Sequence, residues 1–392
     1  MAMEGIFGEA VDRIGGEPIS ARMARRAPIR HLDPTLLVVT LLLSIYGVVM
    51  VQSATASNQS AAGLDPNAFF SRQAMFLLVG AIVLIGVSFV DYRFFAGFAS
   101  VVYGATVGAL ILVLTPLGTL RSGATRWIDL GPMEVQPSEF AKVGVIVALA
   151  AYLALRKGDV RARDVAACVV LVAIPSGLIY VQPDLGSMMV FVALLGALLL
   201  SGGAKIRHFL FLGLCGFVGI VVVLQMGLLK DYQLQRLTSF LDPDPDVRSV
   251  GYNLTQSKIA IGSGGMRGKG LGGENTQTSL DYVPEQHTDF IFTAVGEQLG
   301  FLGSATLLAM FVFLLWRALR IAVMSRDLFG TLLASGIVGL WAFQIFVNVG
   351  MTMGIMPITG IPLPFISYGG SSLITNYIAV GLLLNIHMRR FL

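Results

Sequence analysis

The chain has 392 residues, of which 55% are hydrophobic and only 13% are charged. A soluble domain is about 25% charged, so this composition excludes an ordinary soluble protein and indicates a polytopic membrane protein. The net charge of +4 fits basic inside loops beside anionic lipid headgroups, and it does not suggest a nucleic-acid partner.

Ten apolar stretches are candidates for membrane-spanning helices, each of which needs about 20 apolar residues. They lie near 35–53, 72–90, 95–116, 138–155, 165–181, 185–201, 208–229, 289–316, 328–350 and 371–388. We therefore predict an all-α polytopic membrane protein with about ten transmembrane helices. An even number of spans places both termini on one side of the membrane.

The distribution of Lys and Arg gives the orientation. The segments on the side of the termini hold 17 of the 27 basic residues, and those on the other side hold 9, six of them in one long loop. Both termini are thus predicted to be cytoplasmic, and loop 230–288 extracytoplasmic. Residues 1–34 are interpreted as a disordered basic tail without an evident signal peptide, and 35–392 as the ten-span domain.

Two candidate site regions after span one are the outer end of span two and the outside loop 117–137. Arg72, at the outer end of span two, could extend to the headgroups or contact a substrate. Outside loop 117–137 contains Arg126 and Trp127. Trp127 could anchor the loop at the membrane interface or stack on a sugar face.

Span four begins with Ser138 and Glu139, and Lys142 lies one turn deeper. A lysine within a span is costly and indicates a functional site, with Glu139 as its partner. The alternative is a structural ion pair. Asp184, in the short connection between spans five and six, is an ordinary turn residue or a buried acid.

Loop 230–288 contains Arg236 and Lys258 and a glycine-rich run. Gly268, Gly270 and Gly273 match G-x-G-x-x-G formally, but no strand precedes them and the loop faces outside, so a nucleotide fold is rejected. These glycines are interpreted as allowing sharp turns or close approach to a ligand. Cys168 and Cys215 both lie in apolar spans and indicate neither a disulfide framework nor a metal site.

The loop ends in an acidic stretch, Tyr282 to Phe290. If a helix starts near Pro284, Glu285 and Asp289 share one helix face, with His287 between them. These acids could simply favour the helix start. Residues 357–372 are apolar but hold three prolines and a glycine pair, so they are predicted to form a re-entrant wall beside an outward-facing cavity.

The polar groups predicted at membrane depth gather on the outer side. A transporter needs access from both sides, whereas an enzyme acting on a lipid-linked substrate needs one cavity. A carboxylate there could act as a general base, and basic residues could neutralise a phosphate or pyrophosphate. The sequence has no G-x-S-x-G motif and no clear set of metal ligands, which disfavours acyl hydrolysis and a zinc site.

These motifs resemble the SEDS family of peptidoglycan glycosyltransferases from about residue 35 to the C-terminus. The sequence of residues 282–290 resembles the RodA-type branch, which acts in cell elongation, more than the FtsW paralogue, which acts in division. The matching residues are Arg126 to Ile128, Gln136 to Glu139 with Lys142, Gln182 to Ser187, Gln256 to Gly265, Pro284 to Phe290 and Gly360 to Ser372.

The resemblance implies lipid II as substrate, Asp289 as the catalytic carboxylate, a class B penicillin-binding protein as partner, and the outer face of the bacterial cytoplasmic membrane as location. A divalent cation, Mg or Mn, could assist. The residues expected to bind substrate or support the site are Arg72, Arg126, Trp127, Glu139, Lys142, Asp184, Arg236, Lys258, Glu285 and His287. The alternatives are a lipid II flippase and a non-catalytic scaffold for a penicillin-binding protein.

Overall fold

The computed structural model describes residues 31–121, 124–129, 131, 133–227, 250–273, 276–278, 280, 282 and 285–390. Almost all of the predicted basic tail lies outside these residues, as do Arg236 and Pro284. The predicted division into a tail and a membrane domain therefore stays a prediction.

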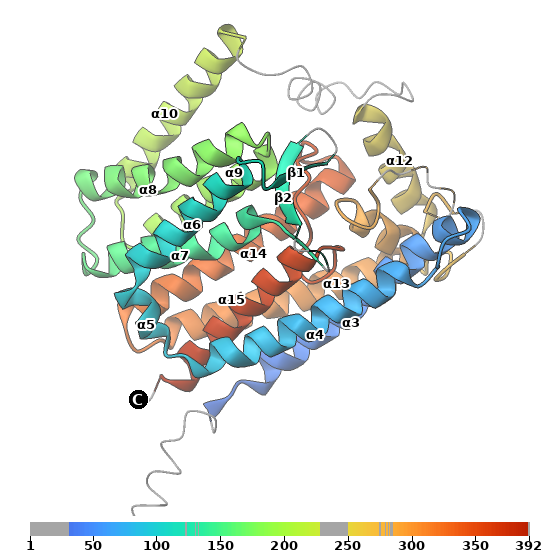
Figure 1. The fold of residues 1–392 in the computed structure, drawn as a ribbon, viewed down its shortest axis with the longest axis horizontal. Helices are drawn as coiled ribbons and strands as arrows, with labels where there is room; N and C mark the ends of the chain where they lie inside the picture. Colours follow the sequence, from blue (N-terminus) through green and yellow to red (C-terminus); the bar gives the residue numbers. More distant parts are fainter. Residues whose placement is uncertain are drawn as a thin grey trace, which may run out of the picture.

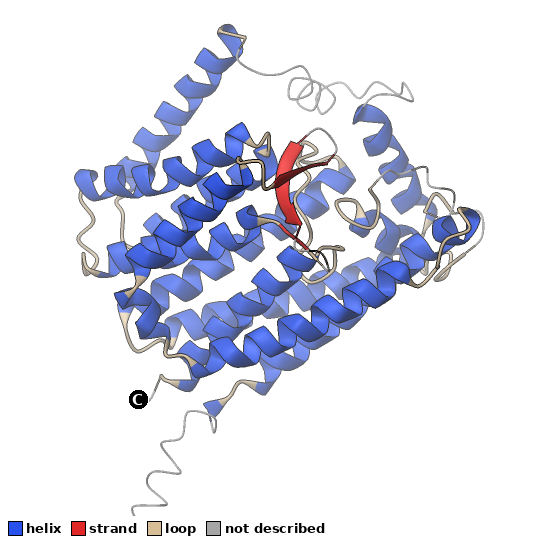
Figure 2. Cartoon of the chain, in the orientation of Figure 1, coloured by secondary structure: helices blue, strands red, loops and turns tan. Residues whose placement is uncertain are grey.

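Helices dominate the described residues (Figures 1 and 2). They are α3 (Pro34–Ala61), α4 (Ala68–Phe89), α5 (Tyr92–Gly97), α6 (Ala99–Val113), α7 (Pro137–Ala154), α8 (Ala162–Val181), α9 (Leu185–Ser201), α10 (Ile206–Gln225), α12 (Val250–Ser263), α13 (Ile291–Val323), α14 (Leu328–Met353) and α15 (Gly370–Met388).

One small antiparallel sheet lies in 117–137, a segment predicted to be an outside loop (Figure 2). Its strands are β1 (Gly118–Arg121), β2 (Ala124–Asp129) and β3 (Glu134–Val135), in that order. Antiparallel backbone pairing between these strands explains why this polar segment has regular structure without apolar periodicity.

Within the described part of the chain, eight helices are long and apolar enough to cross a membrane, which fits a multi-pass membrane protein. Two shorter apolar helices, α6 and α9, lie at the predicted spans 95–116 and 185–201. The all-α membrane fold is thus confirmed, apart from the small sheet. That α6 and α9 also cross the membrane stays a prediction.

Helix α15 lies inside the bundle and packs against α4 and α7 (Figure 1). Its polar side chains, including Ser371, Thr375 and Asn376, are buried against protein. The Trp341 indole of α14 donates a hydrogen bond to Asn376 Oδ1 at 2.8 Å. This bond satisfies the Asn376 amide oxygen, which would be costly to leave unpaired against lipid. Helix α10, by contrast, exposes nearly all its apolar side chains.

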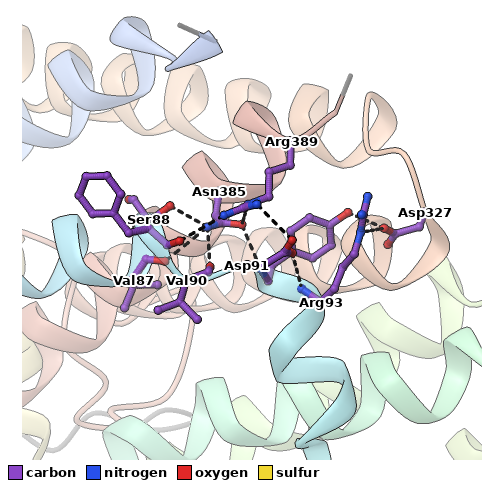
Figure 3. Close-up of polar contacts among 10 residues, drawn as sticks. Val87, Ser88, Val90, Asp91, Arg93, Asp327, Asn385 and Arg389 are labelled. Atoms are coloured by element: carbon purple, nitrogen blue, oxygen red, sulfur yellow. Dashed lines mark hydrogen bonds and ion pairs between the residues drawn. The ribbon is translucent and has the colours of Figure 1, made fainter. Parts of the chain in front are cut away.

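At the predicted inner side, Asn385 near the end of α15 closes the turn between α4 and α5 (Figure 3). Its amide nitrogen donates to the carbonyls of Ser88 (2.7 Å) and Val90 (2.6 Å), which the end of α4 leaves free. Arg389 adds an ion pair with Asp91 at 3.1 Å. Two elements far apart in sequence are thus joined at one junction.

Asp33 caps α3 and forms a buried ion pair with α13. Its Oδ1 accepts from the Thr35 backbone N–H (3.1 Å) and hydroxyl (2.6 Å), and its Oδ2 lies 2.5 Å from Arg317 Nε. Burial alone would raise the pKa of Asp33. Hydrogen bonds from Arg317, Thr35 and Leu36 and the positive charge of Arg317 outweigh burial and hold that pKa below its usual value.

We expect Asp33→Asn, which keeps a capping oxygen, to lower the free energy of unfolding at pH 7 by about 3 kcal/mol. The pKa of Asp33 is lower in the folded than in the unfolded state. Its contribution is therefore complete above the ordinary value of 3.8 and is lost as the pH falls through the folded pKa. Unfolding in detergent between pH 7 and pH 3 should show the difference between the proteins shrinking with acid. A difference independent of pH would contradict this account.

Helix α13 is broken at Gly300, whose φ of 65° and ψ of −159° are not helical. Segment 265–270 is hydrogen-bonded to the break. The backbone N–H groups of Lys269 and Gly270 donate to the carbonyls of Glu297 (3.0 Å) and Gln298 (2.9 Å). In the other direction, Phe301 and Leu302 donate to segment 265–270. The backbone carbonyls and N–H groups that lose their helical partners at Gly300 are thus satisfied by segment 265–270.

Gly268 packs against this break, so the predicted close approach is to the backbone of α13. Its φ is +74°, and a Cβ there would lie 2.1 Å from the Gln298 carbonyl oxygen. Larger side chains are excluded both by backbone conformation and by contact.

Gly268→Ala is expected to destabilise the protein by about 2–5 kcal/mol, because strain and overlap with backbone add. The matched control is Gly262→Ala on α12, where an added Cβ meets nothing within 4 Å. Thermal unfolding of both variants in detergent would measure the effect, and equal unfolding temperatures would refute it.

Candidate functional site

Asp289 lies in a turn, 285–290, that precedes α13. The predicted helix start near Pro284 is wrong, because α13 begins at Ile291. Glu285 has a φ of +54° and does not share a helix face with Asp289. The Asp289 N–H donates to the Glu285 carbonyl at 3.1 Å, so the two acids are ends of one turn.

Distant donors hold three successive carbonyls of this turn, at His287, Thr288 and Asp289. These donors are the Tyr368 N–H (2.9 Å), the Ser367 hydroxyl (2.6 Å) and the Asn348 side-chain amide (2.9 Å), respectively. These bonds fix the backbone of the turn to residues far along the chain.

Residues 355–369, between α14 and α15, are non-helical. Asn348, fully buried on α14, joins them to the Asp289 turn, since its amide also donates to the Ile361 carbonyl at 2.8 Å. The Asp289 carboxylate faces Gly360, where an added Cβ would lie 3.2 Å from Asp289 Oδ2. The half-buried carboxylate is thus seated against this connection. Its predicted depth in the membrane stays a prediction.

Glu139 and Lys142 form the predicted ion pair at the start of α7. Lys142 Nζ lies 2.5 Å from Glu139 Oε1, and their side chains are 1% and 4% exposed. Pro137 occupies the first turn of the helix, where its missing N–H costs nothing. Each charge is buried and depends on the other for compensation.

Asp184 is the N-cap of α9 and is buried. Its Oδ1 accepts from the Ser187 N–H at 3.1 Å, and its Oδ2 accepts from the Ser187 hydroxyl at 2.9 Å and from Gln136 at 3.5 Å. The preceding carbonyls, of Gln182 (3.0 Å) and Pro183, accept from Arg126. Arg126 therefore binds the backbone that carries Asp184.

The start of α9 also approaches the non-helical connection. A Cβ at Gly186 would lie 2.4 Å from the Thr359 carbonyl oxygen, one residue from the glycine that faces Asp289. The Gln136 N–H donates to the Ser371 hydroxyl at 2.9 Å, which joins the starts of α7 and α15. Asp184, the start of α7 and the Asp289 turn are thereby collected at one end of the bundle.

The other predicted site residues lie around this centre. Arg72 and Lys258 are exposed, and Trp127 is half-buried on β2. Lys258 Nζ lies beside Gly354 at the end of α14, where a cation is favourable. The His287 ring packs edge-on to Phe69, with centroids 4.9 Å apart.

Sequence reasoning missed Asn348 and Glu297. Asn348 lies within predicted span 328–350, and as an uncharged side chain it gave a weaker signal of a functional site than a charged residue would. Glu297 is an acid within predicted span 289–316, which is a direct signal of an important residue.

Among the described residues, no three His, Cys, Asp or Glu side chains gather as metal ligands. Mg²⁺ commonly binds through one or two carboxylates and substrate phosphates. The half-buried Asp289 fits that kind of shared site better than a site made of protein ligands alone.

The long apolar helices are those of a multi-pass membrane protein. Buried charged side chains lie together at the starts of these helices and form a polar site between them. Residues 34–391 match the FtsW/RodA/SpoVE family, described as cell cycle proteins. The chain belongs to this family, which confirms the resemblance to SEDS proteins.

Two relatives match nearly the whole chain. Stage V sporulation protein E of Bacillus subtilis is 38% identical over 357 residues, covering 90% of this chain and 96% of that protein. Peptidoglycan glycosyltransferase MrdB of Escherichia coli is 35% identical over 361 residues, covering 92% and 94%.

Two solved structures are also similar. A chain from a peptidoglycan synthase complex described as coordinating polymerization and crosslinking has a TM-score of 0.77 at 32% identity, covering 92% of this chain and 98% of that one. The rod shape determining protein RodA of Thermus thermophilus has a TM-score of 0.68 at 30% identity, with the same coverage.

Proposed function

We propose that this chain is a peptidoglycan glycosyltransferase that polymerises lipid II on the outer face of the cytoplasmic membrane. The observation that carries the proposal is the fixed position of Asp289. Asn348, Ser367 and Tyr368 hold the backbone of its turn, and its carboxylate faces Gly360. The naming of family relatives as peptidoglycan glycosyltransferases supports the reaction class.

In the proposed mechanism, Asp289 removes the proton from the acceptor sugar 4-hydroxyl. That oxygen then attacks the anomeric carbon of the donor sugar with inversion, and undecaprenyl pyrophosphate leaves. Glycosidases typically use two carboxyl groups, one of them to protonate a poor leaving group. A pyrophosphate is a good leaving group, so one general base suffices.

The pyrophosphate charge requires cations near its position in the transition state. Arg72 and Lys258 are exposed, so their charges are available to a ligand. Lys142 and Arg126 already pair with Glu139 and with the Gln182 and Pro183 carbonyls. We therefore assign Lys142, Glu139, Arg126 and Asp184 to shaping the site, and Trp127 to packing on lipid or sugar. A divalent cation bound by Asp289 and the pyrophosphate would supply further charge neutralisation.

The proposed partner is a class B penicillin-binding protein that cross-links the new glycan. The similar chain from a complex described as coordinating polymerization and crosslinking supports this partner. We place the chain in the RodA-type branch, which acts in elongation, because the sequence of residues 282–290 resembles that branch. Relatives named MrdB and FtsW match at similar identity.

The test is polymerisation of purified lipid II by the chain with its transpeptidase partner in liposomes. Glycan strands made with wild-type chain and lost with Asp289→Asn, each beside the same partner, would support the proposal. An intact complex that makes no strands but moves lipid II between leaflets would replace it with the flippase function. Strands that depend only on the partner would indicate a scaffold.

A further inference from the structure

Glu297 is a buried acid that the proposed mechanism does not use. It lies in α13, three residues before the break at Gly300, and its side chain is fully buried. A carboxylate in such a place is costly unless every oxygen is satisfied. The hydrogen-bond donors around the Glu297 carboxylate therefore identify the segments whose positions it fixes.

Four donors surround this carboxylate. Oε1 accepts from Lys269 Nζ at 2.9 Å and from the Gln277 N–H at 2.7 Å. Oε2 accepts from the Thr278 N–H at 2.9 Å and from the Thr278 hydroxyl at 2.6 Å. Three of these donors belong to residues 277 and 278, which have no regular secondary structure. Glu297 thus supplies bonds that a helix or sheet would otherwise provide.

The bonds continue from Thr278 to the turn that carries Asp289. The side-chain amide of Gln286 donates to the Thr278 carbonyl at 2.7 Å and to the Ala54 carbonyl at 3.3 Å. Gln286 is buried and lies three residues before Asp289. The turn is therefore fastened on this side by segment 276–278, and on the other side by Asn348 and Ser367.

We propose that Glu297 is a positioning residue for Asp289, acting through segment 276–278 and Gln286. Glu297 fixes Thr278, Thr278 fixes Gln286, and Gln286 holds the near end of the turn. The role in catalysis rests on the proposed function, whereas the role in ordering the turn does not.

The first experiment measures hydrogen exchange of backbone amides in the full-length protein in detergent. In Glu297→Gln, the side-chain N–H₂ must face either the Thr278 N–H or the Lys269 ammonium and Gln277 N–H. These groups can only donate, so at least one hydrogen bond is lost. We expect exchange about tenfold faster or more in both 276–278 and 285–290, with α12 unchanged. Faster exchange in 276–278 alone would overturn the proposal.

The second experiment measures polymerisation per folded molecule. A misplaced general base should lower kcat about 10- to 100-fold while KM for lipid II changes little. Gln286→Leu breaks the same chain of contacts at its last step, so the double variant should be no worse than the more impaired single variant. Independent, multiplicative losses would overturn the proposal, as would an unchanged kcat with only a lower yield of folded protein.

Thr278→Val provides a milder variant should Glu297→Gln fail to fold, since it removes only the hydroxyl bond to Oε2 and keeps Lys269 as the counter-charge. It should give smaller changes in the same two regions and the same direction of kcat. Asp65→Asn, an exposed acid outside the site, is the control. If the wild type itself made no glycan, the proposed function would fail, while exchange in 285–290 would still decide whether Glu297 holds the turn.

Discussion

Asp289→Asn is expected to reduce lipid II polymerisation by about 100-fold or more, because a positioned general base contributes about 10²–10⁴ to the rate. Asparagine has nearly the same size and cannot accept the proton. The bonds that hold this turn are made by backbone carbonyls, so they should survive the substitution. The variant should therefore fold, bind its partner and bind lipid II.

The measurement compares initial rates of glycan formation for wild type, Asp289→Asn and the Asp65→Asn control, each with the same partner in liposomes. Thermal unfolding of each protein serves as the check on folding. Near wild-type polymerisation by a folded Asp289→Asn protein would show that the carboxylate is not the base. Equal loss in the Asp65 control would point to a fault in the preparation.

The second large effect is expected from breaking the buried pair of α7. Lys142→Met should lower the free energy of unfolding by about 3–5 kcal/mol, since it leaves the Glu139 carboxylate buried without a counter-charge. The side chains are 1% and 4% exposed, so water cannot take over the role of the lost partner. Much of the variant is therefore expected to misfold or aggregate on extraction.

The double variant Glu139→Met/Lys142→Met tests the cause of this loss. Replacing both charges by apolar groups of similar size should restore most of the stability, because no unpaired charge remains. Monodispersity and unfolding temperature in detergent are the measurements. If the double variant is as unstable as Lys142→Met, packing and not charge explains the loss. Activity per folded molecule of the double variant then reports whether the pair is needed beyond folding.

The sequence was sufficient to predict the eight long apolar helices among the described residues, because runs of about 20 apolar residues leave few alternatives to a span. It did not predict α12, which lies within predicted loop 230–288. It did predict a non-helical segment at 357–372, of which 357–369 are non-helical and 370–372 are the first turn of α15. The Glu139–Lys142 pair was predicted from two charges one turn apart. These inferences need only neighbours in sequence.

What could not be predicted depends on partners far along the chain. A helix starting near Pro284 was a sound local inference, yet 285–290 form a turn because donors at Asn348, Ser367 and Tyr368 take their carbonyls. Arg126 was expected to bind substrate or support the site, and no local pattern predicted its hydrogen bonds to the backbone beside Asp184. No local pattern specifies which distant amide will occupy a given carbonyl.

Helix α15 is tied at both ends, and its length therefore matters. Ser371 is bonded to the start of α7 at the candidate site, and Asn385 is bonded to the α4–α5 turn at the opposite end. Its 19 residues span about 28 Å at 1.5 Å per residue, close to the thickness of the hydrocarbon core. Contacts with other helices thus fix both ends of α15. A displacement of the α4–α5 turn would therefore be transmitted along the whole length of α15 to the candidate site.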